Sequence, residues 1–285
     1  MSPLDRLAKR PGSLMIIGGA EDRTDDKEVL RTFIELAGGR DAPLAIVTAA
    51  SEIPDKVWGM YREALSDLGV TALSHVRIES RQAAENEALA QQLQAAGGIF
   101  LTGGDQQRLL ERIGGTRAGA AIRAAYSGHG ACVAGTSAGA SGLCTHMITE
   151  GQADGAPEID GARLADGLGL VSRVVVDQHF SQRHRINRLL GIVAQHPFLL
   201  GAGIDEDTAL VVHGDRSIEV LGNGSVTIVD CRCVQSNIAA LSAGEVPRLL
   251  NVCLHLLPSG SRFTADMQGP LADFIHFLLD STVEP

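Results

Sequence analysis

Residues 131–139 have the sequence ACVAGTSAG, in which an apolar run meets a run of small residues through a serine bounded by glycines. The apolar run at 131–134 predicts a buried strand, and a helix of small residues begins near Ala138. A serine in a Gly-x-Ser-x-Gly segment between a strand and a helix stands out on a tight turn, and the glycines permit close backbone approach. The pentapeptide alone is a weak signal, but both flanks are present. The stretch therefore predicts an elbow that presents Ser137 as a nucleophile.

Upstream of the elbow, short apolar runs alternate with longer segments of helical composition. The expected strands cover residues 13–18, 44–48, 70–78 and 99–102. The expected helices cover residues 27–37, 54–68 and 81–96, and two short helical stretches precede residue 131. Strands that alternate with helices form a parallel sheet with helices on both faces. The first half of the chain therefore predicts a mainly parallel α/β sheet.

Downstream of the elbow the pattern is less regular. Residues 149–169 are rich in Gly, Asp and Ala and predict a long surface excursion. A strand at 171–176 and a helix at 183–195 follow, then strands at 209–212, 217–221 and 225–229, and a final helix at 271–279. Asn223-Gly224 predicts a β-hairpin between the last two strands. No repeat or linker divides the chain, so residues 1–285 are expected to form one domain.

Composition narrows the class of protein. The 285 residues carry a formal net charge of -10, which argues against a nucleic-acid partner. No apolar run approaches the roughly 20 residues of a membrane helix, and residues 1–6 lack the start of a signal peptide, so we expect no membrane partner and a cytoplasmic location. Cys231 and Cys233 have no second Cys/His pair at ligand spacing, which predicts no metal site.

A serine hydroxyl needs a base to accept its proton. Nine histidines are present, and position in the predicted fold favours His179, which follows the strand expected at 171–176. In parallel α/β sheets, functional groups gather where strands end. The alternative is a surface histidine that caps the next helix. We take His179 as the candidate base because it belongs to a polar cluster, Asp177-Gln178-His179.

A third group should orient the imidazole. Three carboxylates, Asp205, Glu206 and Asp207, directly precede the strand at 209–212, and the residues alone leave all three open. Whichever of the three is the acid, the catalytic residues follow one another along the sequence in the order serine, histidine, acid. An α/β-hydrolase esterase has the order serine, acid, histidine and would need His255 or His276 as the base.

Four segments together, in this order and spacing, resemble the cyanophycinase family of serine peptidases. They are Gly103-Gly104-Asp105-Gln106, residues 135–140, residues 177–180 with Arg183, Arg185 and Arg188, and residues 205–209. The resemblance implies a flavodoxin-like sheet and an exopeptidase that degrades cyanophycin, a polyaspartate whose β-carboxyls carry arginine, to β-Asp-Arg dipeptides. It implies Glu206 as the acid, no cofactor, and a homodimer.

The resemblance also implies where the substrate is bound. The backbone N–H groups of Gly104 and Ala138 are expected to receive the oxyanion. The substrate-binding side chains are expected to be Gln106, Asp177, Gln178, Arg183, Arg185 and Arg188. Arg185 and Arg188 lie three residues apart, off the apolar stripe of the predicted helix, which leaves them free to bind carboxylates. Asp177 is a candidate partner for the substrate guanidinium.

Two other functions remain open. A peptidase for isoaspartyl or N-terminal aspartyl peptides would share the triad and differ in its arginine-binding surface. A binding protein without catalytic activity would use the same sheet as a scaffold, since a fold does not fix a function. The intact elbow, base and acid favour the enzyme.

Overall fold

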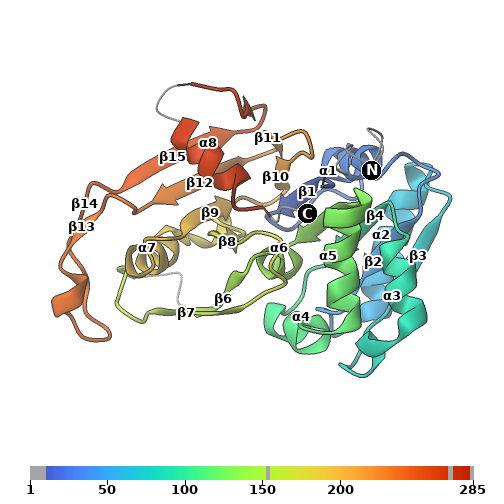
Figure 1. Cartoon of the computed structure of the whole chain (residues 1–285), viewed down its shortest axis with the longest axis horizontal. Helices are drawn as coiled ribbons and strands as arrows, with labels where there is room; N and C mark the ends of the chain where they lie inside the picture. Colours follow the sequence, from blue (N-terminus) through green and yellow to red (C-terminus); the bar gives the residue numbers. More distant parts are fainter. Residues whose placement is uncertain (1–10, 152–154, 269–271, 283–285) are drawn as a thin grey trace, which may run out of the picture.

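The computed structural model describes residues 11–151, 155–268 and 272–282, and Figure 1 shows how its helices and strands are arranged. The expectation for residues 1–6 lies outside these ranges, as do Leu271 at the start of the predicted final helix and residues 152–154 of the predicted excursion.

Eight α-helices are found in the described ranges. They are α1 (Glu28–Leu36), α2 (Pro54–Asp67), α3 (Glu87–Gln94), α4 (Gln106–Ile113), α5 (Arg117–His129), α6 (Ala138–Leu143), α7 (Ile186–Gln195) and α8 (Ala272–Leu279). The predicted pattern of helices in the first half is present, with one exception. The helix expected over 81–96 is broken at Asn86, whose backbone is extended and whose side chain accepts a hydrogen bond from Leu89 N at 3.1 Å to cap α3.

The larger sheet has eight strands in the order β16-β11-β10-β1-β5-β4-β2-β3. The parallel strands are β1 (Leu14–Ile17), β2 (Leu44–Val47), β3 (Leu73–Val76), β4 (Gly98–Leu101) and β5 (Cys132–Thr136). The antiparallel extension consists of β10 (Thr208–Val212), β11 (Ser217–Gly222) and β16 (Arg262–Thr264). Read from the edge, the parallel strands β3-β2-β4-β5 follow a flavodoxin-like order, and the first strand of the chain, β1, lies next to β5.

The two faces of this sheet bury different helices. In β1, Leu14 and Ile16 belong to a core shared with α3, α4, α5 and α6, whereas Met15 and Ile17 belong to a core shared with α1 and α2. All four strand residues are fully buried, as expected of a strand covered on both sides. The sheet is therefore held between two helical layers, which confirms the predicted fold class and fixes the strand ends in space.

A smaller sheet of four strands lies beside the larger one (Figure 1), in the order β15-β12-β9-β8. Its strands are β8 (Val174–Gln178), β9 (Leu200–Ile204), β12 (Ser225–Asp230) and β15 (Cys253–Pro258). The apolar face of α7 packs on it through Leu189, Ile192 and Val193. The sequence analysis did not predict β9, which carries two glycines in five residues.

The hairpin predicted at Asn223-Gly224 is wrong. β11 pairs with β10 and β16, while β12 pairs with β9 and β15, so the chain crosses from one sheet to the other at this turn. Tertiary hydrogen bonds explain the crossing, because Asn223 N donates to Asp207 O and Gly224 N donates to Thr208 Oγ1, drawing the turn toward the start of β10. The consecutive strands that do pair antiparallel in this region are β10 and β11.

Part of the predicted excursion at 149–169 is regular. β6 (His146–Gly151) and β7 (Ala162–Asp166) form an antiparallel pair with an irregular register near Ile148. Most β7 side chains are partly or fully exposed, so the sequence carries no alternation there. A further two-stranded pair is made by β13 (Gln235–Ser236) and β14 (Leu249–Leu250).

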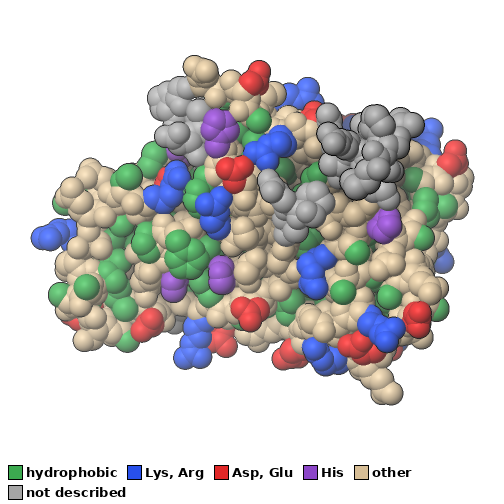
Figure 2. All heavy atoms as spheres, viewed as in Figure 1, with side chains coloured by type: hydrophobic (Ala, Val, Ile, Leu, Met, Phe, Trp, Pro, Cys, Tyr) green, Lys and Arg blue, Asp and Glu red, His purple; other side chains and the backbone are tan. Residues whose placement is uncertain are grey.

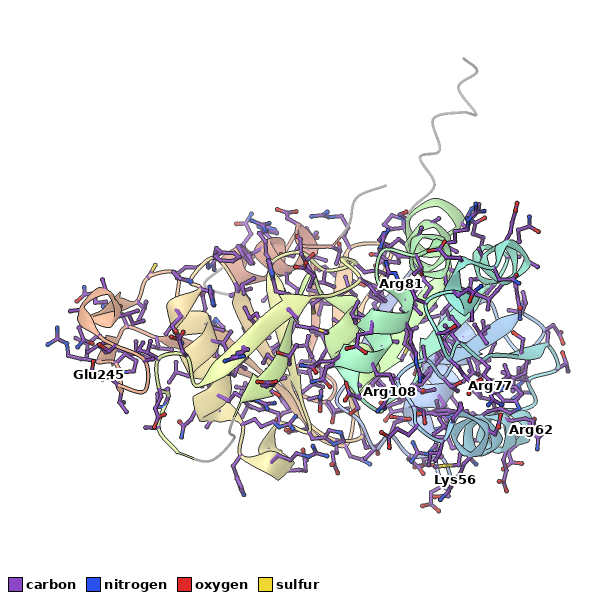
Figure 3. All side chains as sticks on the ribbon, turned by 90° about the horizontal axis from the view of Figure 1, so that it is seen from below. Lys56, Arg62, Arg77, Arg81, Arg108 and Glu245 are labelled. Carbon is purple, nitrogen blue, oxygen red and sulfur yellow. The ribbon has the colours of Figure 1, made fainter. Side chains whose placement is uncertain are left out.

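Charged side chains of both signs are interspersed over the face shown in Figure 2. Figure 3 shows five labelled basic residues on the half built around the parallel strands and Glu245 at the opposite end. Two of them are paired with acids, Arg77 with Asp55 and Arg108 with Glu52. Among the described helices, none combines the length and the apolar character that crossing a bilayer demands.

Candidate active site

Ser137 lies at the end of β5, on the elbow that the sequence predicts. Its backbone has φ 52° and ψ -114°, a conformation that costs on the order of 1–3 kcal/mol for a residue with a side chain. The turn is tight, since a Cβ placed on Gly135 would lie 2.5 Å from the carbonyl carbon of Gly139. Ser137 N donates to Ile17 O of β1 at 3.0 Å, which ties the elbow to the neighbouring strand.

Ser137, His179 and Glu206 form one hydrogen-bonded chain, which we call the triad. Ser137 Oγ lies 2.9 Å from His179 Nε2, and His179 Nδ1 lies 2.6 Å from a Glu206 carboxylate oxygen. The three residues come from the ends of β5, β8 and β9, so the triad takes its serine from the larger sheet and its histidine from the smaller one. A proton on Nδ1 directed at Glu206 leaves Nε2 as an acceptor for the serine hydroxyl.

The surroundings of His179 favour its neutral form. Burial lowers the pKa of the imidazole, the hydrogen bond that His179 donates to Glu206 opposes that shift, and the nearby positive charge of Arg183 adds to it. The His179 residue is 9% exposed, whereas the Glu206 side chain is 37% exposed. The geometry therefore provides an uncharged base beside a partly exposed hydroxyl.

The two neighbouring carboxylates have structural partners. Asp205 accepts hydrogen bonds from the backbone N–H groups of Ser181 and Ser225. Burial opposes ionisation of Asp205, but hydrogen bonds from these two serines outweigh it and lower its pKa. Asp207 accepts from Asp22 N at 2.7 Å. The alternatives left open by the residues alone are thus separated by contacts, and Glu206 is the carboxylate that meets His179.

The histidines that an esterase order would require lie in other settings. His276 Nε2 is 2.7 Å from Ala265 O, and His255 Nε2 is 3.4 Å from Cys253 Sγ on β15. Neither is bonded to Ser137 among the contacts of the described residues, so the order serine, histidine, acid is the one that the geometry assembles.

The two predicted oxyanion donors flank the serine. Ala138 is the first residue of α6, where backbone N–H groups have no partner within the helix. On the other side, a Cβ on Gly103 would lie 3.8 Å from Ser137 Oγ, so the Gly103-Gly104 turn passes close to the hydroxyl. Gly104 has φ 145°, and a Cβ there would lie 2.3 Å from Ala50 O, so no larger residue fits.

Asp177, Gln178, Arg185 and Arg188 form a compact group beside the triad, which we call the arginine cluster. Arg188 makes a bidentate contact with Asp177, with Nε 2.9 Å from one oxygen and Nη2 bonded to the other. Arg185 Nη1 reaches Asp177 at 3.2 Å and the Gln178 side-chain oxygen at 2.9 Å. The Asp177 side chain is 1% exposed and each arginine side chain is 10% exposed.

This cluster corrects the sequence-based expectation. Arg185 and Arg188 are not free, because both guanidinium groups are bonded to Asp177, and the Asp177 carboxylate is occupied by the chain's own arginines. The predicted helix also begins later than residue 183, since His184 has φ 51° and α7 starts at Ile186. One polar atom in the cluster, Arg185 Nε, is buried without a hydrogen-bond partner.

The remaining predicted binding residues are placed differently. Arg183 is exposed in the short 3₁₀ turn Ser181–Arg183, four residues after His179, and its side chain makes no ion pair within the described part of the chain. Gln106 begins α4 just after the Gly103-Gly104 turn, and its amide donates to Ile148 O at 2.9 Å. Among the three arginines predicted to bind substrate, Arg183 is thus the one without an ion pair to a described residue.

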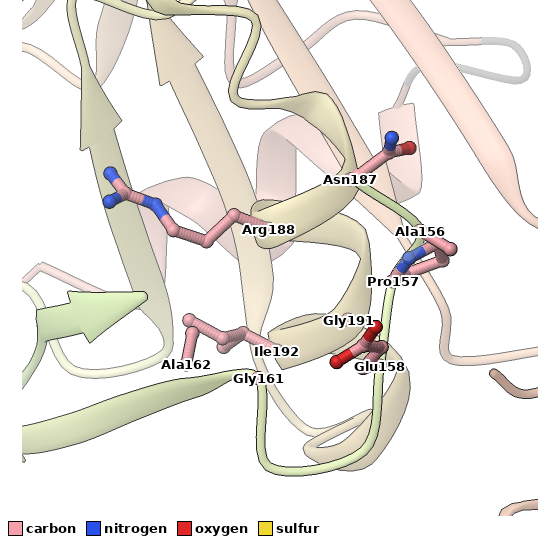
Figure 4. A pocket seen from close by; sticks show the side chains of 9 residues that line it. All are labelled: Ala156, Pro157, Glu158, Gly161, Ala162, Asn187, Arg188, Gly191 and Ile192. Carbon is pink, nitrogen blue, oxygen red and sulfur yellow. The ribbon is translucent and has the colours of Figure 1, made fainter. Parts of the chain in front are cut away.

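A cavity of about 180 Å³ is lined in part by Arg188 of the arginine cluster (Figure 4). It lies between α7 and residues 156–162. Polar side chains in its lining are Glu158, Asn187 and Arg188. Arg188 belongs both to the lining of this cavity and, through its contact with Asp177, to the arginine cluster.

Sequence reasoning missed the contribution of Gly18-Gly19 at the end of β1. A Cβ on Gly19 would lie 2.4 Å from His179 Cε1, so the imidazole rests directly on this glycine, which has φ 101°. A Cβ on Gly18 would lie 1.9 Å from Asp205 O. The available signal is a glycine pair directly after the buried strand β1.

No group of three or more His, Cys, Asp or Glu side chains is placed to hold a metal ion within residues 11–151, 155–268 and 272–282. Cys132, Cys144 and Cys231 are buried free thiols, and Cys233 and Cys253 are exposed ones.

Comparison with known proteins agrees with this geometry. The sequence model of peptidase family S51 matches residues 14–220. The cyanophycinase of Trichormus variabilis is 40% identical over 252 residues, covering 88% of this chain and 85% of the relative. The cyanophycinase of Geminocystis herdmanii is 37% identical over 264 residues, covering 92% and 97%. The crystal structure of a peptidase from an acI-B1 Actinobacterium has a TM-score of 0.64 at 24% identity, covering 89% of this chain and 97% of that one, and so shares the fold.

Proposed function

The chain belongs to peptidase family S51, a family of serine-type peptidases, and we propose that it is an exopeptidase that degrades cyanophycin to β-Asp-Arg dipeptides. The observation that carries the proposal is the hydrogen-bonded triad at the strand ends. The substrate is inferred from relatives named cyanophycinase that match most of this chain.

In the proposed reaction, His179 Nε2 accepts the proton of Ser137 as the hydroxyl oxygen attacks an aspartate–aspartate peptide carbonyl. The oxyanion receives hydrogen bonds from the N–H groups of Gly104 and Ala138. His179 then gives the proton to the leaving amine, the C–N bond breaks, and an acyl-enzyme remains on Ser137. Water, deprotonated by the same imidazole, releases the product. Glu206 stabilises the imidazolium in both halves.

Binding of the zwitterionic repeat is assigned to the surface beside the triad. Arg183 is exposed and uncommitted, which suits a partner for a substrate carboxylate. Gln106, at the start of α4, and Gln178, directly before His179, are the amides assigned to the same surface. Asp177, Arg185 and Arg188 are held by one another, so we assign them to the wall of the binding surface, where a substrate group would have to exchange with an existing ion pair.

The arrangement of the triad also supports one functional domain over residues 1–285, since separating the two sheets would separate Ser137 from His179. We further propose a homodimer in the cytoplasm. Support for the dimer comes from β15, a strand paired on one side in the described sheet, whose Leu254 and Leu256 are 54% and 62% exposed. Sedimentation of the full chain tests the dimer.

The test of function is incubation with purified cyanophycin, followed by detection of soluble β-Asp-Arg. We expect Ser137→Ala to lower the rate by on the order of 10⁶-fold without changing the fold. Clearing that survives this substitution refutes the serine mechanism. Cleavage of isoaspartyl or N-terminal aspartyl peptides in place of cyanophycin would keep the mechanism and change the substrate.

A further inference from the structure

Glu21 is a buried charged residue that the proposed mechanism leaves unused. It follows β1 by four residues, and its side chain is 0% exposed. Three donors meet its carboxylate. They are Arg23 Nη1 at 3.0 Å, Thr136 Oγ1 at 2.5 Å, and the Tyr61 hydroxyl of α2.

The contact with Thr136 lies at the elbow itself. Thr136 is the last residue of β5 and directly precedes Ser137, whose φ of 52° is unfavourable. Strained residues keep their conformation only when the surrounding structure fixes it. The Thr136 hydroxyl is bonded to Glu21, so the residue that enters the strained position is fixed by its side chain as well as by the sheet.

The same short segment, residues 18–21, also contacts the other two loops of the triad. Gly18 O accepts from His179 N at 2.8 Å, and Gly19 O accepts from Asp207 N, adjacent to Glu206, at 2.8 Å. Moving this segment would therefore displace all three triad members relative to one another.

Stability alone does not explain a carboxylate at this position. A buried ion pair is often no more stabilising than apolar side chains of the same volume, because both charges lose their hydration. Burial and the charge of Glu21 raise the pKa of the Tyr61 hydroxyl well above the usual value, so this hydroxyl keeps its proton and donates a hydrogen bond to Glu21. A polar group here is more readily explained by the geometry that its hydrogen bonds impose.

We propose that Glu21 is a positioning residue that aligns the triad by joining the end of β1 to the nucleophile elbow through Thr136. The inference rests on the proposed function, in that Ser137 is taken as the nucleophile. Because Glu21 does not touch the substrate surface described above, its loss should lower kcat and leave KM nearly unchanged. A displacement of about 1 Å in a catalytic group can lower the rate about 100-fold.

The experiment compares Glu21→Gln, Thr136→Val and Thr136→Ser in the full chain. Thr136→Val removes the hydroxyl at constant shape, and Thr136→Ser retains it. Thr116→Val is the matched control, because Thr116 is also a buried threonine whose hydroxyl is bonded to backbone groups, at the start of α5. The readouts are kcat and KM on cyanophycin, the rate of Ser137 labelling by a fluorophosphonate, and thermal unfolding.

We expect Glu21→Gln and Thr136→Val to slow labelling and lower kcat by about 10- to 100-fold, while Thr136→Ser and Thr116→Val stay close to the unmodified protein. Labelling at the unmodified rate in Glu21→Gln and Thr136→Val, or a loss no larger than that of Thr116→Val, overturns the role of Glu21. The labelling assay does not depend on the substrate, so failure to clear cyanophycin with normal labelling refutes the substrate alone. An unmodified protein that is not labelled refutes both proposals.

Discussion

Asp177 of the arginine cluster and His179 of the triad lie two residues apart at the end of β8, yet the two groups satisfy their polar atoms in opposite ways. His179 lies in a hydrogen-bonded chain with the Ser137 hydroxyl at one end and Glu206, whose side chain is 37% exposed, at the other. Asp177, two residues earlier, is closed in by two guanidinium groups. The first arrangement leaves a reactive group available, and the second uses charge to hold α7 against the smaller sheet. Proximity to a catalytic group therefore does not by itself make a charged residue available to substrate.

After removal of the nucleophile itself, the largest effect should come from breaking the triad at Glu206 while preserving its shape. We expect Glu206→Gln to lower kcat by about 10⁴-fold, because an amide can hold the imidazole in the wrong tautomer and cannot stabilise its charged form. Steady-state kinetics on cyanophycin measures this. Asp205→Asn and Asp207→Asn are the matched controls, and an equal loss of kcat in either, with unchanged stability, would reassign the acid.

The next effect concerns the arginine cluster and should appear in stability. Asp177→Asn leaves two buried guanidinium groups without their carboxylate, and we expect the free energy of unfolding to fall by about 3–5 kcal/mol. Urea denaturation measures it. Asp55→Asn is the control, since it breaks the Arg77 pair, whose side chains are 43% and 70% exposed, and should cost about 0–1 kcal/mol. Equal losses in the two variants would remove the distinction between the regions.

A smaller effect tests the platform under the imidazole. Gly19→Ala places a methyl group against the His179 ring, and we expect kcat to fall about 100-fold. Gly39→Ala is matched in backbone conformation, with φ 96° against 101°, and has no atom within 4 Å of the added methyl group. Gly39→Ala should lose stability, measured by thermal unfolding, from its positive φ alone, Gly19→Ala should lose more because the ring must also shift, and only Gly19→Ala should lose activity. Similar kinetics in the two would mean that the ring contact is unimportant.

The smallest effect is a shift of pH dependence. His179 must be neutral to accept a proton, so activity should rise with pH through its pKa, and burial together with Arg183 places that pKa below the usual value. Arg183→Gln removes one positive charge, which should move the acid limb of kcat/KM toward higher pH. The pH profile at low and high salt measures the shift, which salt should reduce because Arg183 is exposed. A limb that moves to lower pH would contradict the assignment of His179.

The alternation of strands and helices in residues 13–139 was predictable because β1, β2, β4 and β5 are buried on both faces and the helices have an apolar side. The same physics did not reveal β7, whose side chains are mostly exposed, or the path at Asn223-Gly224. Local turn chemistry favours a hairpin there, and hydrogen bonds to Asp207 and Thr208 override it.

By itself the sequence determined the elbow, the parallel sheet and the choice of Ser137 and His179, because strand ends and glycine-bounded turns are local properties of the chain. The residues alone left Asp205, Glu206 and Asp207 open and only the family resemblance favoured Glu206, whereas the tertiary structure separates the three carboxylates by the groups that they meet. It also decided that Arg185 and Arg188 are bonded within the chain while Arg183 is not. Charge and spacing along the sequence indicate which groups can pair, but burial and distance in the folded chain determine which pairs form.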